Sequence, residues 1–205
     1  MAAEIVSGAS HLPTVEELDR IAAPEFVASV APLFEGAPRF LGRLAAARPF
    51  GSAEALFDRA RAIAAAMPPD EQIELINAHP RLGAPPSSVS VRSFVEQGYD
   101  RDAAAARHAA DEADEAEEAE RKRVGTELDR LNAAYEARFG FRYCVFVAGR
   151  PRAALIPGME AALEANREAE VRRALDAVVD IAADRWAAAS AGRTAGRTAD
   201  KSDRR

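Results

Sequence analysis

A histidine and a set of polar side chains that could act together in acid–base chemistry lie between residues 79 and 97. His79 is followed by Pro80, and the residue before a proline disfavours the α region, so we expect the preceding helix to end at His79. There the imidazole lies at the negative end of the helix dipole, which favours the imidazolium and predicts a pKa closer to neutral. A group of this kind is suited to donating a proton.

Three polar residues follow after a loop rich in proline and glycine. Glu96 and Gln97 lie three and four residues after Ser93, which places the three side chains on one face if a helix begins near Ser93. The same S-x-x-E pattern is an ordinary capping box, in which Ser93 and Glu96 only start a helix. Most single histidines at helix ends also carry no chemistry. The pattern alone therefore leaves a catalytic and a purely structural interpretation open.

Composition narrows the class of protein. The chain has 205 residues with 27 Lys and Arg against 33 Asp and Glu, a net charge of −6, which makes sequence-independent nucleic-acid binding a poor candidate function. The single cysteine, Cys144, has no Cys or His neighbour at metal-ligand spacing, and we expect it to be a small buried side chain. No apolar run reaches transmembrane length, so we expect no membrane association and a cytoplasmic protein.

Apolar periodicity predicts an all-α, single-domain bundle of seven to nine helices over residues 12–188. The β-prone run Phe141–Val147 has no second strand to pair with, so we expect an extended segment between helices. The run from Asp102 to Arg123 is almost entirely alanine and charged residues, which indicates a long solvated helix that Gly125 could interrupt. We expect residues 1–11 to be flexible and residues 189–205 to form a disordered tail.

Six stretches, in order, resemble one family, the 2-oxo-4-hydroxy-4-carboxy-5-ureidoimidazoline (OHCU) decarboxylases of uric acid degradation. The resemblance covers about residues 12–188 and implies a compact helical bundle that is often dimeric, which agrees with the architecture expected from periodicity. The stretches are FVASVAPLFEGAP (26–38), RPFGS (48–52), INAHPRLG (76–83), SFVEQ (93–97), LNAAYEARFGF (131–141) and DIAADR (180–185).

The resemblance also implies an activity and a site. It implies a cofactor-free decarboxylation of a small-molecule substrate that yields (S)-allantoin. His79 would be the acid–base group and Pro80 would hold its orientation, while Glu96 would orient the substrate. The further residues that the resemblance places against the substrate are Ser93 and Gln97 of the SFVEQ motif and the extended segment around Tyr143, Val145 and Val147.

One departure from the family pattern bears on activity. The family has an arginine in an R-x-x-N motif near the penultimate helix, and the matching position here is Ala162 or Leu163, depending on the register. A neutral side chain does not replace a guanidinium that grips an anion. Three arginines could substitute: Arg81 beside the His-Pro pair, which we assign to substrate binding, and Arg150 and Arg152 after the extended segment. Each could equally be a surface charge. Without a substitute arginine, the chain would be a binding or scaffold protein, or a decarboxylase for a related substrate.

Overall fold

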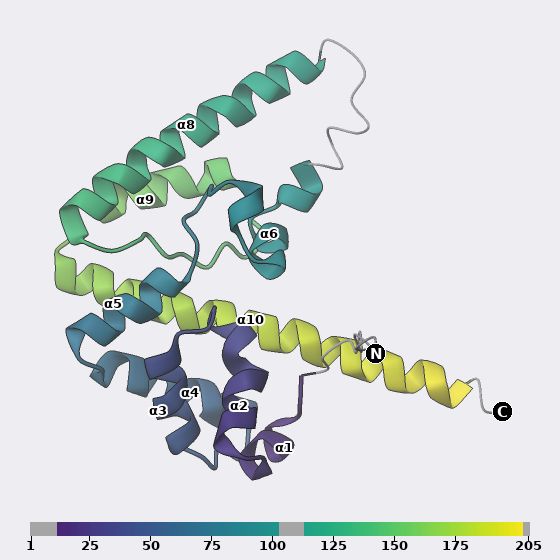
Figure 1. Cartoon of the computed structure of the whole chain (residues 1–205). Coiled ribbons are helices and arrows are strands. Elements are labelled where there is room, and N and C mark those ends of the chain that lie inside the picture. The colour runs from purple at the N-terminus through teal and green to yellow at the C-terminus, as the bar shows by residue number, and fades with distance from the viewer. Residues whose placement is uncertain (1–11, 103–112, 203–205) are drawn as a thin grey trace, which may run out of the picture.

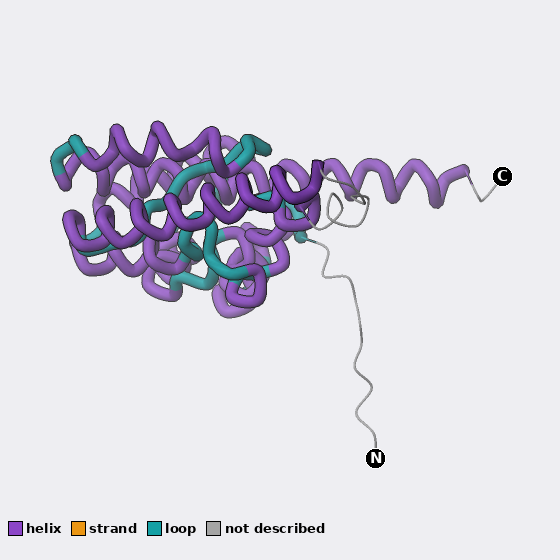
Figure 2. The backbone as a smooth tube through the Cα atoms, turned by 90° about the horizontal axis from the view of Figure 1, so that it is seen from above, coloured by secondary structure: helices purple, strands orange, loops and turns teal. Residues whose placement is uncertain are grey.

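The computed structural model describes residues 12–102 and 113–202, which form helices and loops without a β-strand in those ranges (Figure 2). The predicted all-α bundle is confirmed, with slightly more helices than expected, because residues 99–102 are helical in addition to the helices bounded below. Short 3-10 turns lie at Ala31–Leu33, Pro86–Ser88 and Arg152–Leu155. The α-helices are α1 (Val15–Arg20), α2 (Ala23–Val30), α3 (Pro38–Ala46), α4 (Ala53–Ala66), α5 (Pro69–Ala78), α6 (Val91–Glu96), α8 (Ala113–Phe139), α9 (Ile156–Leu163) and α10 (Arg167–Ser202).

The helix α10 runs through the middle of the molecule, with α1–α4 on one side and α8 and α9 on the other (Figure 1). It packs on α4 and α5 through a buried apolar stripe that includes Val178, Ile181 and Ala182. Near its middle, Trp186 meets the ring of Phe57 edge-on at 6.2 Å between centroids. Burial of such a stripe is the main source of stability for a helix in a protein.

Two expectations about helix ends are wrong. The predicted disordered tail from residue 189 is helical up to Ser202, because α10 continues through an alanine-rich run that contains no proline. Gly192 and Gly196 each cost a helix only about 1 kcal/mol relative to alanine and do not end it. Gly125 likewise does not interrupt α8, which is continuous over 27 residues. The predicted flexible residues 1–11, and residues 103–112 of the charged run, lie outside the described ranges.

The segment after α8 is extended, as predicted, and it is held against the end of α5. Asn77 accepts a hydrogen bond from the Arg142 main-chain N–H at 2.9 Å, and Arg142 Nη1 donates to the carbonyls of Asn77 and His79 at 2.8 and 3.1 Å. On the other side, Arg173 of α10 donates to the Cys144 carbonyl at 2.8 Å. These bonds place residues 142–147 beside His79.

Candidate active site

The site lies in one cavity of about 430 Å³, a size suited to a small-molecule ligand. The structure brings most of the predicted site residues to this cavity, although they come from α5, α6 and the extended segment. Three arginine candidates, Arg81, Arg150 and Arg152, are not part of its wall. The predicted residues that line it are His79, Pro80, Ser93, Glu96, Gln97, Tyr143, Val145 and Val147.

His79 is the most unusual of these residues. It follows the last residue of α5, as predicted, and its main-chain N–H donates to the Ile76 carbonyl at 3.2 Å. The side chain is buried, with only 4% of the residue exposed, yet neither ring nitrogen has a hydrogen-bond partner within the described structure. Buried polar atoms in proteins are nearly always paired. An unpaired imidazole in the wall of a cavity is therefore a candidate for pairing with a bound ligand.

The predicted near-neutral pKa of His79 is wrong. Burial and, to a smaller extent, the positive charge of Arg185 together lower the pKa from 6.5 to about 4, against the opposing effects of the Glu35 carboxylate and the Leu75 main chain. Desolvation of the charged form thus outweighs the attraction of the helix dipole. His79 is a neutral imidazole at pH 7, which both accepts and donates a proton.

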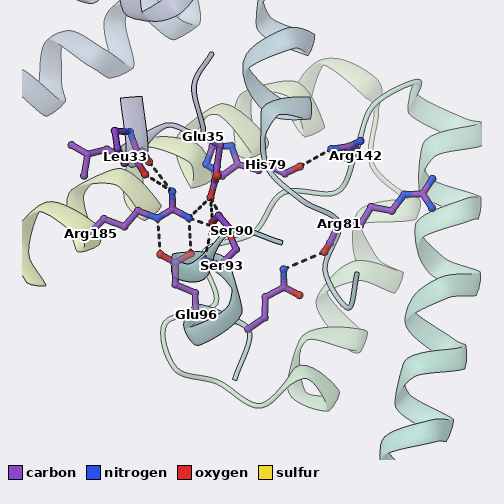
Figure 3. Close-up of polar contacts among 11 residues, drawn as sticks. Leu33, Glu35, His79, Arg81, Ser90, Ser93, Glu96, Arg142 and Arg185 are labelled. Carbon is purple, nitrogen blue, oxygen red and sulfur yellow. Dashed lines mark hydrogen bonds and ion pairs between the residues drawn. The ribbon is translucent and has the colours of Figure 1, made fainter. Parts of the chain in front are cut away.

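A buried arginine forms the other half of the site (Figure 3). The Arg185 side chain, 2% exposed, pairs with Glu96 through two hydrogen bonds, Nε to Oε1 at 2.6 Å and Nη2 to Oε2 at 2.8 Å. Its Nη2 also donates to Glu35 Oε1 at 2.8 Å, and Nη1 donates to the carbonyls of Pro32 and Leu33 at 3.1 Å. Every N–H of the guanidinium therefore has a partner, and the charge is shared between two carboxylates.

The structure places Arg185, and not the possible substitutes Arg81, Arg150 or Arg152, in the wall of the cavity. Ala162 and Leu163 lie on α9 and do not line the cavity. The arginine comes instead from the DIAADR stretch on α10. A sequence indicator existed, because Arg185 lies three and four residues after Ala182 and Ile181, on the apolar face of the helix. A charge in a buried stripe needs partners, and such a residue is a functional candidate.

The capping-box interpretation of Ser93 and Glu96 is also wrong. The N-cap of α6 is Ser90, whose Oγ accepts from the Ser93 N–H at 3.1 Å. This leaves the Ser93 hydroxyl to donate to Glu35 Oε1 at 2.9 Å and to accept from Arg185 Nη2 at 3.2 Å. Ser90 Oγ donates to the same Glu35 oxygen.

Glu35 is a site residue that the sequence analysis missed. Partial burial raises the pKa of its carboxyl, but Arg185 and the two serine hydroxyls outweigh that effect and hold it below its usual value. Its backbone has a φ of 51°, a region that non-glycine residues seldom adopt. The turn aims the carboxylate at Arg185, Ser90 and Ser93 (Figure 3). Nothing in its local sequence distinguished it from a surface glutamate.

Gln97 and Arg81 serve structure in this arrangement. Gln97 Oε1 accepts from the Gly83 N–H at 2.8 Å and Nε2 donates to the Arg81 carbonyl at 3.2 Å, so its amide holds the loop that follows Pro80. Arg81 pairs with Glu136 of α8, which conflicts with its predicted role in binding substrate. Arg152 pairs with Asp102, and Arg150 Nε donates to the Val147 carbonyl.

Other chemistries find less support in the described ranges. Cys144 is buried, as predicted, and burial raises the pKa of its thiol to about 12, so it is not a thiolate at neutral pH. Among these residues, no cluster of three His, Cys, Asp or Glu side chains is arranged to bind a metal ion. Nor does any of the described helices have the length and apolar character needed to span a bilayer.

Comparison with known proteins places these features in one class. The fold is all-α, and its cavity has the size and the polar lining groups suited to a small polar molecule. The family model described as OHCU decarboxylase matches residues 19–187, and the chain belongs to this family. It is therefore a carboxy-lyase of the type that acts in purine degradation.

Several relatives are moderately similar. The chain is 28% identical over 168 residues to the 2-oxo-4-hydroxy-4-carboxy-5-ureidoimidazoline decarboxylase of Haloferax volcanii, covering 82% of this chain and 90% of that one. It is 30% identical over 162 residues to a uric acid degradation bifunctional protein of Bacillus subtilis, covering 79% of this chain but only 30% of the longer protein.

Two solved structures share the fold. One is a crystal structure of OHCU decarboxylase in the presence of (S)-allantoin, with a TM-score of 0.53 and 20% identity, covering 76% of this chain and 92% of that one. The other is an (S)-allantoin synthase, with a TM-score of 0.57 and 19% identity, covering 86% of this chain and 54% of that one.

The buried cluster of Arg185, Glu35 and Glu96 predicts that removing the arginine strongly lowers stability. Arg185→Met leaves Glu35 and Glu96 partly buried without a cationic partner, which should lower the free energy of unfolding by about 3–5 kcal/mol in urea denaturation. Arg172→Met is the matched control, because Arg172 is an exposed residue of the same helix whose ion pair among the described residues is with Glu168. In a Glu35→Gln, Glu96→Gln background the cost of Arg185→Met should fall by at least about 1 kcal/mol. An equal loss of unfolding free energy in both backgrounds would show that Arg185 does not stabilise the fold through these two carboxylates.

The lowered pKa of His79 predicts a loss of stability in acid. Because the folded pKa of about 4 lies below the unfolded value of 6.5, the unfolded state takes up a proton first as the pH falls through that window. Between pH 7.5 and pH 5 the protein should therefore lose about 2 kcal/mol more unfolding free energy than His79→Asn does. Urea denaturation of both proteins at the two pH values measures this difference. Parallel pH dependence would show that His79 titrates normally in the folded state.

Proposed function

We propose that the protein catalyses the cofactor-free decarboxylation of 2-oxo-4-hydroxy-4-carboxy-5-ureidoimidazoline to (S)-allantoin. The observation that carries the proposal is the unpaired imidazole of His79 in the same cavity as the Glu96–Arg185 pair. Family membership and the decarboxylase from Haloferax volcanii support the substrate.

The chemistry of this substrate needs no added electron sink. The carboxylate is attached to C4, next to the C5=N1 double bond of the ring. When the C4–carboxylate bond breaks, its electron pair forms a C4=C5 double bond and the C5=N1 pair moves to N1, which takes up a proton. The result is CO₂ and an enol with its hydroxyl on C4. To become allantoin, the enol must lose the hydroxyl proton and gain a proton on C5.

A neutral His79 is suited to that last exchange. Its imidazole accepts the proton of the C4 hydroxyl and delivers a proton to C5, so the residue ends in the state in which it began. Because burial lowers the pKa of His79, its imidazole is unprotonated when the substrate binds and can act first as a base. Because His79 approaches from one wall of the cavity, the proton reaches one face of C5, which gives a single enantiomer.

The remaining site residues recognise the polar ring and the ureido group. Glu96, held by Arg185, presents carboxylate oxygens to substrate N–H groups. Val145 lies in the extended segment and makes no main-chain hydrogen bond with the described residues, so its N–H and carbonyl are available to the substrate. Tyr143 and Val147 complete this wall, and Pro80 fixes the end of α5. Ser93 and Gln97 act indirectly, through Arg185 and the Arg81–Gly83 loop.

The alternatives that followed from a missing arginine lose their main argument. A scaffold protein was favoured by the absence of a cation from the site and by the charged run from Asp102 to Arg123, and Arg185 removes the first of these two arguments. A decarboxylase for a related substrate is the second candidate, since Arg185 is fully occupied by protein partners and does not grip a substrate anion directly.

Turnover of the proposed substrate tests the assignment. The substrate is generated from urate in the cuvette, and the circular dichroism of the allantoin formed is followed over time. We expect rapid formation of one enantiomer, and a loss of at least about 100-fold in rate for His79→Asn, in line with the usual contribution of general acid–base catalysis. Arg59→Gln, a substitution of an exposed residue on α4, serves as the control and should keep the rate.

Two results would count against this function. A rate no faster than spontaneous decay would favour the related-substrate candidate. Full enantioselective turnover by His79→Asn would remove His79 from the proton transfer, whatever the substrate.

We further propose that the enzyme acts in the cytoplasm as a homodimer. The resemblance to the family supports both statements. Light scattering of the purified protein should give about twice the chain mass of 21.9 kDa. A mass equal to that of one chain at micromolar concentration would contradict the dimer.

A further inference from the structure

The charges around the cavity raise a question that Arg185 does not answer. The proposed substrate is an anion, yet the Arg185 guanidinium is shared between Glu35 and Glu96. The cavity is also lined by Asp184, an exposed residue without an ion pair among the described residues. With His79 neutral, Arg185, Glu35, Glu96 and Asp184 together carry a net charge of −2 before any substrate binds. An anion would be repelled unless another cation faces it.

Arg101 is that cation. It lines the same cavity, it is exposed, and it forms no hydrogen bond or ion pair with any residue that the structure describes. Of the nearby arginines, Arg150 donates to the Phe146 and Val147 carbonyls and Arg152 Nη2 pairs with Asp102. The unpartnered Arg152 Nη1 is buried, and neither residue lines the cavity. With respect to the described residues, the Arg101 guanidinium beside the cavity therefore has its hydrogen-bond donors available for a ligand.

The absence of a side chain at Gly98 leaves room for the Arg101 guanidinium. Gly98 has a φ of +80°, and a Cβ at this position would lie 2.8 Å from Arg101 Nη2. Any other residue at 98 would therefore push the guanidinium out of its place beside the cavity. The glycine directly follows Gln97, so the same turn that ends the SFVEQ motif places Arg101.

We propose that Arg101 captures the carboxylate of the substrate at the mouth of the cavity and thereby selects anionic substrates. This role deepens the proposed function and rests on it for the identity of the substrate. A guanidinium and a carboxylate form two parallel charge-assisted hydrogen bonds, which favour an anion over its neutral analogue.

The chemistry of decarboxylation determines which kinetic constant Arg101 affects. As the C4–carboxylate bond breaks, negative charge leaves the carboxylate and moves into the ring. A cation on the carboxylate consequently stabilises the bound substrate at least as much as the transition state, and this lowers KM without raising kcat. Arg101 is therefore a substrate-binding residue, and the proton transfer remains with His79.

Kinetics of matched arginine variants test the proposal. Arg101→Gln should raise KM by about 10-fold and leave kcat unchanged or slightly higher, and Arg101→Lys should raise KM less. Arg92→Gln on α6 is the control, because it removes the same charge from an exposed arginine that does not line the cavity. Its KM should stay within about twofold. A KM rise below threefold for Arg101→Gln, or a loss in kcat with KM unchanged, would overturn the proposal.

Direct binding separates this proposal from the proposed function. Hydantoin-5-acetate and hydantoin share a ureido ring and differ in the carboxylate, and calorimetry measures their affinities without turnover. The unmodified protein should bind the acid more tightly, and Arg101→Gln should lose most of that preference while Arg92→Gln keeps it. An absent preference in the unmodified protein, or one that survives Arg101→Gln, would overturn the role of Arg101. Absence of turnover with this preference intact would instead reject only the decarboxylase assignment.

Discussion

The site depends on one buried interaction, the ion pair of Arg185 with Glu96 and Glu35. A buried guanidinium is costly unless each of its donors is paired, and here the partners come from three separate parts of the chain. Pro32, Leu33 and Glu35 come from the turn after α2, Ser93 and Glu96 from α6, and the arginine itself from α10. Because no one of these elements satisfies the charge alone, the interaction fixes how they meet.

The charged and polar groups around the cavity have different tasks. Arg185 is saturated, so it orders the carboxylates and lowers the pKa of His79 by its charge. His79 is buried and unpaired, which makes it a neutral imidazole able to exchange protons with a ligand. Arg101 lies at the exposed side with its donors available. The groups that hold the fold are paired within the protein, whereas His79 and Arg101, two of the groups proposed to meet the substrate, have no hydrogen-bond partner among the described residues.

Several family motifs prove to be structural when seen in three dimensions. In RPFGS, Arg48 donates to the carbonyls of Leu18, Ile21 and Ala45, which joins the α1–α2 and α3–α4 connections. In LNAAYEARFGF, Asn132 holds the loop after Pro80 through the Leu82 carbonyl at 2.9 Å. Structural motifs and substrate-binding motifs look alike in a sequence, because the residues that bind buried carbonyls and those that bind a substrate are of the same chemical types.

The sequence alone determined the all-α class, the end of α5 at His79, the buried core stripe and the extended segment, because these follow from local periodicity and from proline and glycine. It also identified His79, Glu96 and the residues around Tyr143 as neighbours through the family resemblance. Only the tertiary structure decided the pKa of His79, the cap at Ser90, and the roles of Arg185, Glu35 and Arg101. Burial and ion pairing depend on segments as far apart as residues 35 and 185, and no local pattern contains that information.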